Sequence, residues 1–263
     1  RQMCIRDRPE SESDYRARID TVKQPYVSHE TGQWCVFPNF NEIRKYTGVN
    51  KAKNFEIFRD ILNDNHMGGQ SYDFMMASGK LQALCYKHEI EKTLRTPDYA
   101  GFQLLALNDY SGQGTALVGV LDVFFEEKGY INAEQFRRFC SPTVPLARIP
   151  KFVYANDETF HADIEVSHFG AAPLQGAKTS YTIKDKFGKV YAKGTVGTQT
   201  IPIGNLCALG SVDMNLKGID TPQKLNLEVC IEGSDAVNDW DFWVYPAPVS
   251  YTHLRAHETE LHL

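Results

Sequence analysis

The spacing of apolar residues changes near residue 141, and this change divides the chain into two kinds of structure. Before that point, apolar residues recur at intervals of three and four or form short continuous runs. Amphipathic helices and buried strands produce these two patterns. After that point, apolar and polar residues alternate one by one, as in FHADIEVS at residues 160–167. This alternation is typical of half-buried strands, so the sequence predicts an α/β part followed by an all-β part.

The composition allows a sizeable core and excludes several classes of protein. The chain has 263 residues, of which 42% are hydrophobic, enough for one or two domains. No run approaches the roughly 18 apolar residues of a spanning helix, so we expect no membrane span. The net charge of -5 argues against a nucleic-acid-binding surface. The six cysteines show neither a C-x-x-C pair nor zinc-type spacing, and we expect no metal site, no disulfide framework and no cofactor.

In the first part, two predicted strands enclose two predicted helices. The strands are residues 24–28 and 100–107, and the helices are residues 51–65 and 71–94. This order forms a βαβ unit with parallel strands. Polar residues follow both strands, at the end of the sheet that carries the active site in a TIM (β/α)8 barrel. We therefore assign residues 9–140 to the last βα units of such a barrel, a partial catalytic domain.

Glu30 is the acid that follows the first predicted strand, in the segment SHETGQW. A strand end that delivers a carboxylate beside Gly32 and an aromatic residue is one way to present a catalytic nucleophile. Taken alone, the segment fits an ordinary strand-to-loop junction with an exposed acid better. His29 and Glu30 begin like the zinc motif H-E-x-x-H, but Gln33 stands where its second histidine is required.

Asn41 and Glu42 form the only Asn-Glu dipeptide of the chain. Such a pair carries the acid/base in some glycosidases. Asn39, three residues before Glu42, instead suggests a capping box at a helix start, because the two side chains can each bind the other's backbone N–H. We favour the capping interpretation.

The second part reads as a linker followed by a sandwich. Residues 141–150 contain three prolines, which predicts a stiff linker. Residues 151–248 contain several short alternating strands with turn signals between them, typical of an immunoglobulin-like β-sandwich. Trp240, Phe242 and Trp243 are candidates for a sugar platform, but a core or interdomain anchor is the interpretation we favour.

The two ends do not resemble folded protein. Residues 1–8 have no periodicity, and residues 249–263 follow Pro246 and Pro248. Both resemble translated sequencing-adapter DNA, so we treat them as artefactual or disordered. We expect the chain to be truncated at both ends, and the localisation is therefore unknown.

Three segments, taken in order, resemble glycoside hydrolase family 2. YVSHETGQW at residues 26–34 is similar to the family's nucleophile segment, in which Gly follows two residues after Glu. FQLLALNDY at residues 102–110 resembles the last barrel strand with its Asn-Asp end, and LVGVLD at residues 117–122 resembles the turn into the closing helix. A β-sandwich follows the barrel in many members, so the resemblance covers about residues 15–246.

The resemblance implies a retaining, exo-acting β-glycosidase, an O-glycosyl hydrolase of carbohydrate metabolism whose substrate is a β-glycoside such as an oligosaccharide. It implies Glu30 as the nucleophile and His29, Trp34, Asn108 and Asp109 as substrate-binding residues. A second carboxylic acid, about 5–5.5 Å from the nucleophile, acts as acid and base in that mechanism. The family carries this acid after an Asn on an earlier strand that is missing here, so we expect the chain alone to be inactive.

His29 departs from the family pattern, which commonly has Ser before the nucleophile, and this leaves the subfamily open. The family also suggests a periplasmic or secreted location and allows a homo-oligomer for the full-length protein. The alternative class is a non-catalytic carbohydrate-binding or structural β-sandwich with a helical appendage. Further βα units encoded upstream would favour the hydrolase.

Overall fold

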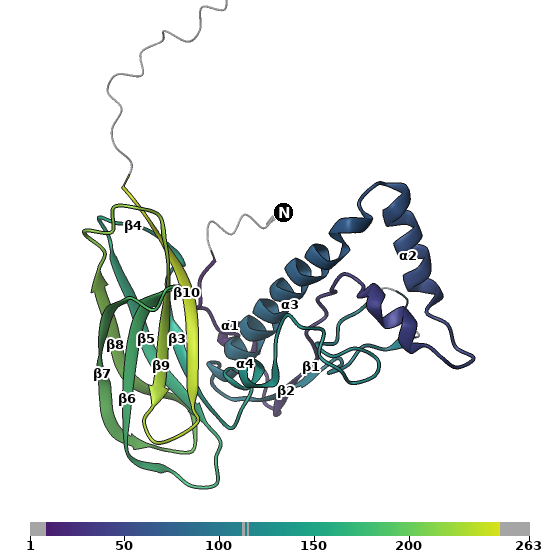
Figure 1. The fold of residues 1–263 in the computed structure, drawn as a ribbon. Coiled ribbons are helices and arrows are strands. Elements are labelled where there is room, and N and C mark those ends of the chain that lie inside the picture. Colours follow the sequence, from purple (N-terminus) through teal and green to yellow (C-terminus); the bar gives the residue numbers. More distant parts are fainter. Residues whose placement is uncertain (1–8, 112–113, 115, 248–263) are drawn as a thin grey trace, which may run out of the picture.

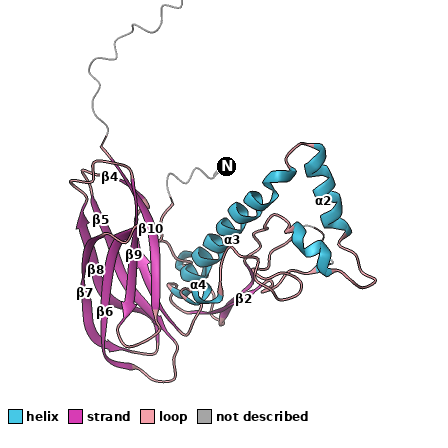
Figure 2. Ribbon diagram, in the orientation of Figure 1, coloured by secondary structure: helices cyan, strands magenta, loops and turns pink. Residues whose placement is uncertain are grey.

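The computed structural model describes residues 9–111, 114 and 116–247. A helix-rich part and a part made of strands lie side by side in it (Figures 1 and 2). The ends interpreted as artefactual, residues 1–8 and 249–263, lie outside the described residues. Within the described residues, no helix is both long and apolar enough to cross a membrane.

The helix-rich part contains the predicted βαβ unit, because its two strands pair in parallel with the predicted helices between them in sequence. Its elements are α1 (Arg16–Ile19), β1 (Tyr26–Thr31), the 3-10 helix η1 (Phe40–Lys45), α2 (Lys53–Asp64), the 3-10 helix η2 (Gly68–Gln70), α3 (Ser71–Leu94), β2 (Tyr99–Leu104) and α4 (Ala133–Arg137).

The longest helix, α3, has the bounds that the sequence predicts. Met75, Tyr86 and Ile90 are buried on its inner side. The helix ends before Pro97, since a residue that precedes proline avoids the helical conformation. Local spacing and a proline stop are therefore sufficient to define this element.

No TIM barrel is evident in the described residues, and the predicted last βα units of such a barrel correspond there to one parallel βαβ unit. The sheet of β1 and β2 has two strands, whereas a (β/α)8 barrel closes with eight. Tyr26 and Val27 of β1 are 41% and 52% exposed, although strands of a parallel barrel are covered on both faces. The apolar run at residues 100–107 also stops being a strand at Leu104. An apolar run predicts a strand without revealing what covers it.

The second part is a sandwich of two sheets. One sheet has the order β4-β10-β9-β6-β7 and the other the order β3-β5-β8. Their facing side chains form the largest core of the described chain. The strands are β3 (Thr143–Arg148), β4 (Val153–Ala155), β5 (Thr159–His168), β6 (Leu174–Asp185), β7 (Val190–Ile201), β8 (Gly204–Asn215), β9 (Gln223–Ile231) and β10 (Val237–Tyr245).

The prediction of a linker at residues 141–150 is wrong, because this segment contains β3. Strand β3 pairs antiparallel with β5, from Thr143 opposite His168 to Arg148 opposite Asp163. The three prolines of this segment suggested a linker. Since β3 lies at the edge of its sheet, Pro145 does not need to donate a ladder hydrogen bond on the outer side.

Trp240 joins the two parts of the molecule. Its indole Nε1 donates to Glu91 of α3 at 3.0 Å, and the side chain is buried. The predicted anchor role is confirmed for Trp240, and Phe242 belongs to the core, where its ring stacks on that of Phe160. The Trp243 side chain lies on the opposite face of β10 from Phe242 and is exposed.

Candidate functional site

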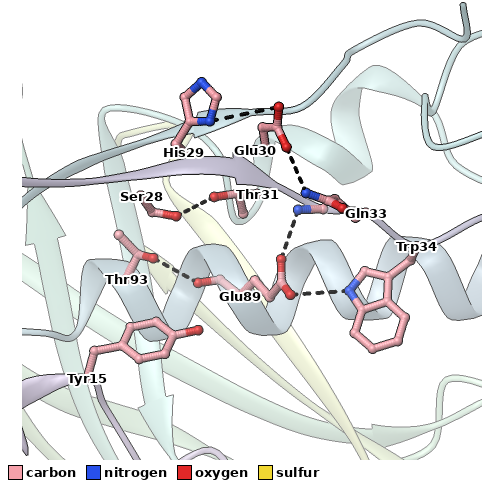
Figure 3. Close-up of a pocket in the computed structure, with 10 residues that line it drawn as sticks. Tyr15, Ser28, His29, Glu30, Thr31, Gln33, Trp34, Glu89 and Thr93 are labelled. Carbon is pink, nitrogen blue, oxygen red and sulfur yellow. Dashed lines mark hydrogen bonds and ion pairs between the residues drawn. The ribbon is translucent and has the colours of Figure 1, made fainter. Parts of the chain in front are cut away.

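A pocket of about 450 Å³ is lined by residues of β1, of the segment that follows it and of α3 (Figure 3). Of the residues expected to form the site, His29, Glu30 and Trp34 line it. Asn108 and Asp109 do not. The lining residues are Tyr15, Ser28, His29, Glu30, Thr31, Gly32, Gln33, Trp34, Glu89 and Thr93.

Glu30 lies near the carboxyl end of β1 in a left-handed backbone conformation, with φ of 56°. Residues other than glycine adopt this conformation at a cost, and they do so more often at functional sites. The Glu30 side chain is 47% exposed and accepts a hydrogen bond of 3.1 Å from Gln33 Nε2. His29 Nδ1 lies 3.9 Å from its other oxygen. Figure 3 shows both His29 and Glu30 on the side of β1 that faces away from α3.

Gly32 is required by the packing around it. It has φ of +87°, and a Cβ atom at this position would lie 1.9 Å from Cε1 of Tyr86. Tyr86 is itself buried, and its hydroxyl donates to the carbonyl of Val118 at 2.8 Å. Packing against the Tyr86 ring therefore explains the glycine two residues after Glu30, because only glycine lets the chain pass so close to the ring.

Glu89 lines the pocket and was not predicted from the sequence. It projects from α3 toward β1 and accepts hydrogen bonds from Gly32 N at 3.0 Å and Trp34 Nε1 at 3.3 Å. A signal was available, since Gln82, Tyr86, Glu89 and Thr93 recur at intervals of three and four. Polar residues at this spacing share one helix face. Here that face meets the segment after Glu30.

Asp109 does not lie at the rim of the pocket, which corrects the expectation from the sequence. It is buried, lies 2.6 Å from Lys128 Nζ and accepts a hydrogen bond of 2.9 Å from Gly119 N. Asn108 is half-buried and donates to the backbone carbonyl of Asp109 at 3.0 Å. After β2 the chain turns inward, which a local apolar pattern does not reveal. Both residues thus make internal contacts.

Glu42 does not complete the expected capping box. Asn39 caps η1 by accepting from Asn41 N at 3.1 Å, as predicted. The Glu42 side chain instead lies fully buried, and neither carboxyl oxygen has a hydrogen-bond partner among the described residues. Burial raises the pKa of Glu42 to about 7. Glu42 does not line the pocket, so the structure gives no support to an acid/base role there.

Metal ligation finds no support in the described part of the chain. No group of three or more His, Cys, Asp and Glu side chains has an arrangement that could hold a metal ion there.

Comparisons with known proteins give one family match, over about a third of the chain. Residues 158–246 match a family described as "Domain of unknown function (DUF8488)". This match covers most of the sandwich and none of the pocket. The search of curated proteins found no match.

Solved structures similar to this chain include two glycoside hydrolases and a small β domain. A β-glucuronidase of Parabacteroides merdae is 14% identical with a TM-score of 0.28, over 37% of this chain and 13% of its own. An Amycolatopsis orientalis exo-chitosanase is 14% identical with a TM-score of 0.38, over 65% and 19%. A CARDB domain from Pyrococcus furiosus is 13% identical with a TM-score of 0.29, over 40% and 94%. At these TM-scores, none of the likenesses assigns an activity to this chain.

Proposed function

We propose that this chain is the carboxyl-side part of a retaining β-glycosidase resembling glycoside hydrolase family 2, with Glu30 as its nucleophile. The observation that carries the proposal is the position of Glu30. It lies near the carboxyl end of a parallel strand, on the face opposite the covering helix α3. In a (β/α)8 barrel the helices cover the outside, and catalytic groups lie at the carboxyl ends of the strands. This position of Glu30 supports the proposal.

In this mechanism, a Glu30 carboxylate oxygen attacks the anomeric carbon while the bond from that carbon to the leaving oxygen breaks. A second carboxylic acid protonates the leaving oxygen. It then removes a proton from the water that hydrolyses the glycosyl-enzyme ester. The product is a sugar with retained configuration, and Glu30 is regenerated as a carboxylate.

Glu89 is unsuited to be that second carboxylic acid. Its two oxygens already accept hydrogen bonds from Gly32 and Trp34, and it lies on the α3 side of β1. We propose that the acid/base is supplied by another strand of the parent barrel, and we expect the chain alone to be inactive. His29 remains as a substrate contact, since its side chain is exposed beside Glu30, whereas Trp34 is exposed but bound to Glu89 on the α3 side of β1.

The test uses the enzyme encoded by the full-length gene. A 2-deoxy-2-fluoro-β-glycoside with a reactive leaving group should leave a sugar covalently attached to Glu30, located by peptide mass spectrometry. The Glu30→Ala variant should lose turnover of aryl β-glycosides by roughly 10⁴-fold or more, the scale of nucleophile removal. Galactosides, glucuronides and mannosides would be compared to identify the sugar. A Glu30→Ala enzyme that keeps its turnover would exclude Glu30 as the nucleophile.

The second candidate is a carbohydrate-binding sandwich without catalysis, and one observation favours it. Trp243 and Tyr245 are 37% and 46% exposed and lie two residues apart on β10, hence on one face of the sheet. An exposed aromatic face of this kind can stack on sugar rings. Binding of oligosaccharides that Trp243→Ala abolishes and Glu30→Gln leaves unchanged would support this candidate over the hydrolase.

A further inference from the structure

We propose that Glu89 is a positioning residue for the nucleophile, which it holds in place through Gly32 and Trp34. This inference rests on the proposed function of Glu30. Each oxygen of the Glu89 carboxylate takes one donor, with Gly32 N at 3.0 Å from Oε2 and Trp34 Nε1 at 3.3 Å from Oε1. Hydrogen bonds to an ionised acceptor are stronger than neutral ones. One side chain of α3 thus ties down two points of the segment that follows Glu30.

The contacts continue from this segment to the nucleophile itself. Gln33 lies between the two tethered residues, and its side-chain amide donates to Glu30 Oε2 at 3.1 Å. Figure 3 shows the whole series, from α3 through the segment to the carboxylate on the far side of β1. Movement of Gly32 or Trp34 would therefore shift the group that orients Glu30.

The segment needs to be held, because its backbone is not in a relaxed conformation. Glu30 has φ of 56°, a left-handed conformation that costs on the order of 1–3 kcal/mol outside glycine and persists only where the surroundings enforce it. Gly32 is also left-handed and lies directly against the Tyr86 ring. Glu89 and Tyr86, on successive turns of α3, supply the enforcement from one side.

The partners of Glu89 indicate a local role. Among the described residues, no cation forms an ion pair with Glu89, and both donors to its carboxylate come from this segment. Its neighbour Glu91, in contrast, binds cations and the sandwich. Glu89 is half-buried near the carboxyl end of α3, where neither a helix cap nor an interdomain contact explains an acid.

The first experiment measures the contact in this chain, without any assumption about activity. In ¹H–¹⁵N spectra, the indole peak of Trp34 is identified by its loss in Trp34→Phe. Glu89→Gln leaves an oxygen for only one of the two donors, so the Trp34 indole and Gly32 amide peaks should both shift. The matched control is Glu134→Gln, the same change at an exposed acid of α4, which should leave both peaks in place. Unmoved peaks in Glu89→Gln would refute the contact.

The second experiment measures the consequence in the full-length enzyme. Glu89→Gln should lower kcat by roughly 10- to 100-fold, the effect of misplacing a reacting group, while KM changes little. Labelling of Glu30 by the fluoroglycoside should slow by the same factor. A purely structural role would lower the yield of folded enzyme and leave kcat per folded molecule unchanged, and that result would overturn the proposal. If Glu30→Ala stays active, the proposed function fails, and the peak shifts still report on the contact.

Discussion

The burial of Glu42 is not compensated by hydrogen bonds within the described part of the chain. The side chain is inaccessible to solvent, and both carboxyl oxygens are without partners among the described residues. Burial raises its pKa to about 7, and the neighbouring Asp122 and Asp109 add to the rise, while Lys128 and Lys45 oppose it. A buried carboxylate is costly when ionised, so this group favours its protonated form.

The raised pKa of Glu42 makes the stability of the folded chain decrease as the pH rises. Because its folded pKa lies above the ordinary 4.5, its contribution is fully present below about 4.5 and is lost as the pH rises through about 7. Glu42→Gln removes the charge. It should stabilise the chain on the order of 2–3 kcal/mol at about pH 8 and little at about pH 4. Thermal unfolding followed by circular dichroism at both values checks this. Equal melting temperatures at about pH 8 would contradict it.

At the scale of elements, α3 connects the pocket to the sandwich. Glu89 binds the segment after β1, and one half-turn later Glu91 is buried against the other part of the molecule. Glu91 accepts from Asn238 Nδ2 at 2.8 Å and Trp240 Nε1 at 3.0 Å. Burial works against its charge, but the cations around it hold the pKa of Glu91 below its ordinary value. The sandwich therefore fixes the helix that carries Glu89.

Glu91→Ala should destabilise the chain strongly. Arg95 is buried 3.2 Å from Glu91, and Lys87 also pairs with it, so removal of the acid leaves two cations without their counter-charge. Breaking one side of a buried ion pair costs about 3–5 kcal/mol. Urea unfolding measures the loss, with Glu134→Ala as the exposed control. A midpoint equal to that of the unchanged chain would show that the network adds nothing to stability.

At the scale of the whole molecule, the sandwich begins earlier in the chain than its sequence suggests. Strand β3 follows α4 closely, so the connection between the two parts is itself a strand. Val144 and Leu146 of β3 are fully buried. The two parts are thus joined by buried contacts, and the sandwich is incomplete without residues 143–148.

Two shortened chains test this boundary. Residues 141–247 should fold on their own, whereas residues 151–247 should not. The shorter chain lacks Ala147 and Ile149 of the sandwich core, of which burial of the isoleucine alone is worth about 1.5–3 kcal/mol, and it leaves β5 paired with β8 alone. Dispersed peaks in ¹H–¹⁵N spectra and cooperative thermal unfolding identify the folded chain. Cooperative unfolding of residues 151–247 would restore the linker interpretation.

Periodicity and local stop signals in the sequence were enough to predict the bounds of α3, the parallel pairing of β1 with β2 and the strand-rich second part. They also singled out Glu30 and Gly32, because a strand end and its glycine are adjacent in the chain. The strand pairing follows from the order strand, helices, strand, and the other features depend on residues a few positions apart, whose contacts follow from helix and strand geometry.

Only the tertiary structure decided the partners that lie far apart in the chain. It paired β3 with β5, where prolines suggested a linker, and it buried Asp109 against Lys128, where a strand end suggested an exposed rim. It also placed Glu89 against Gly32. The physical reason is the same in each case: a buried charge or an edge strand is stabilised by a partner from another element, and no local pattern of apolar residues records which element that is.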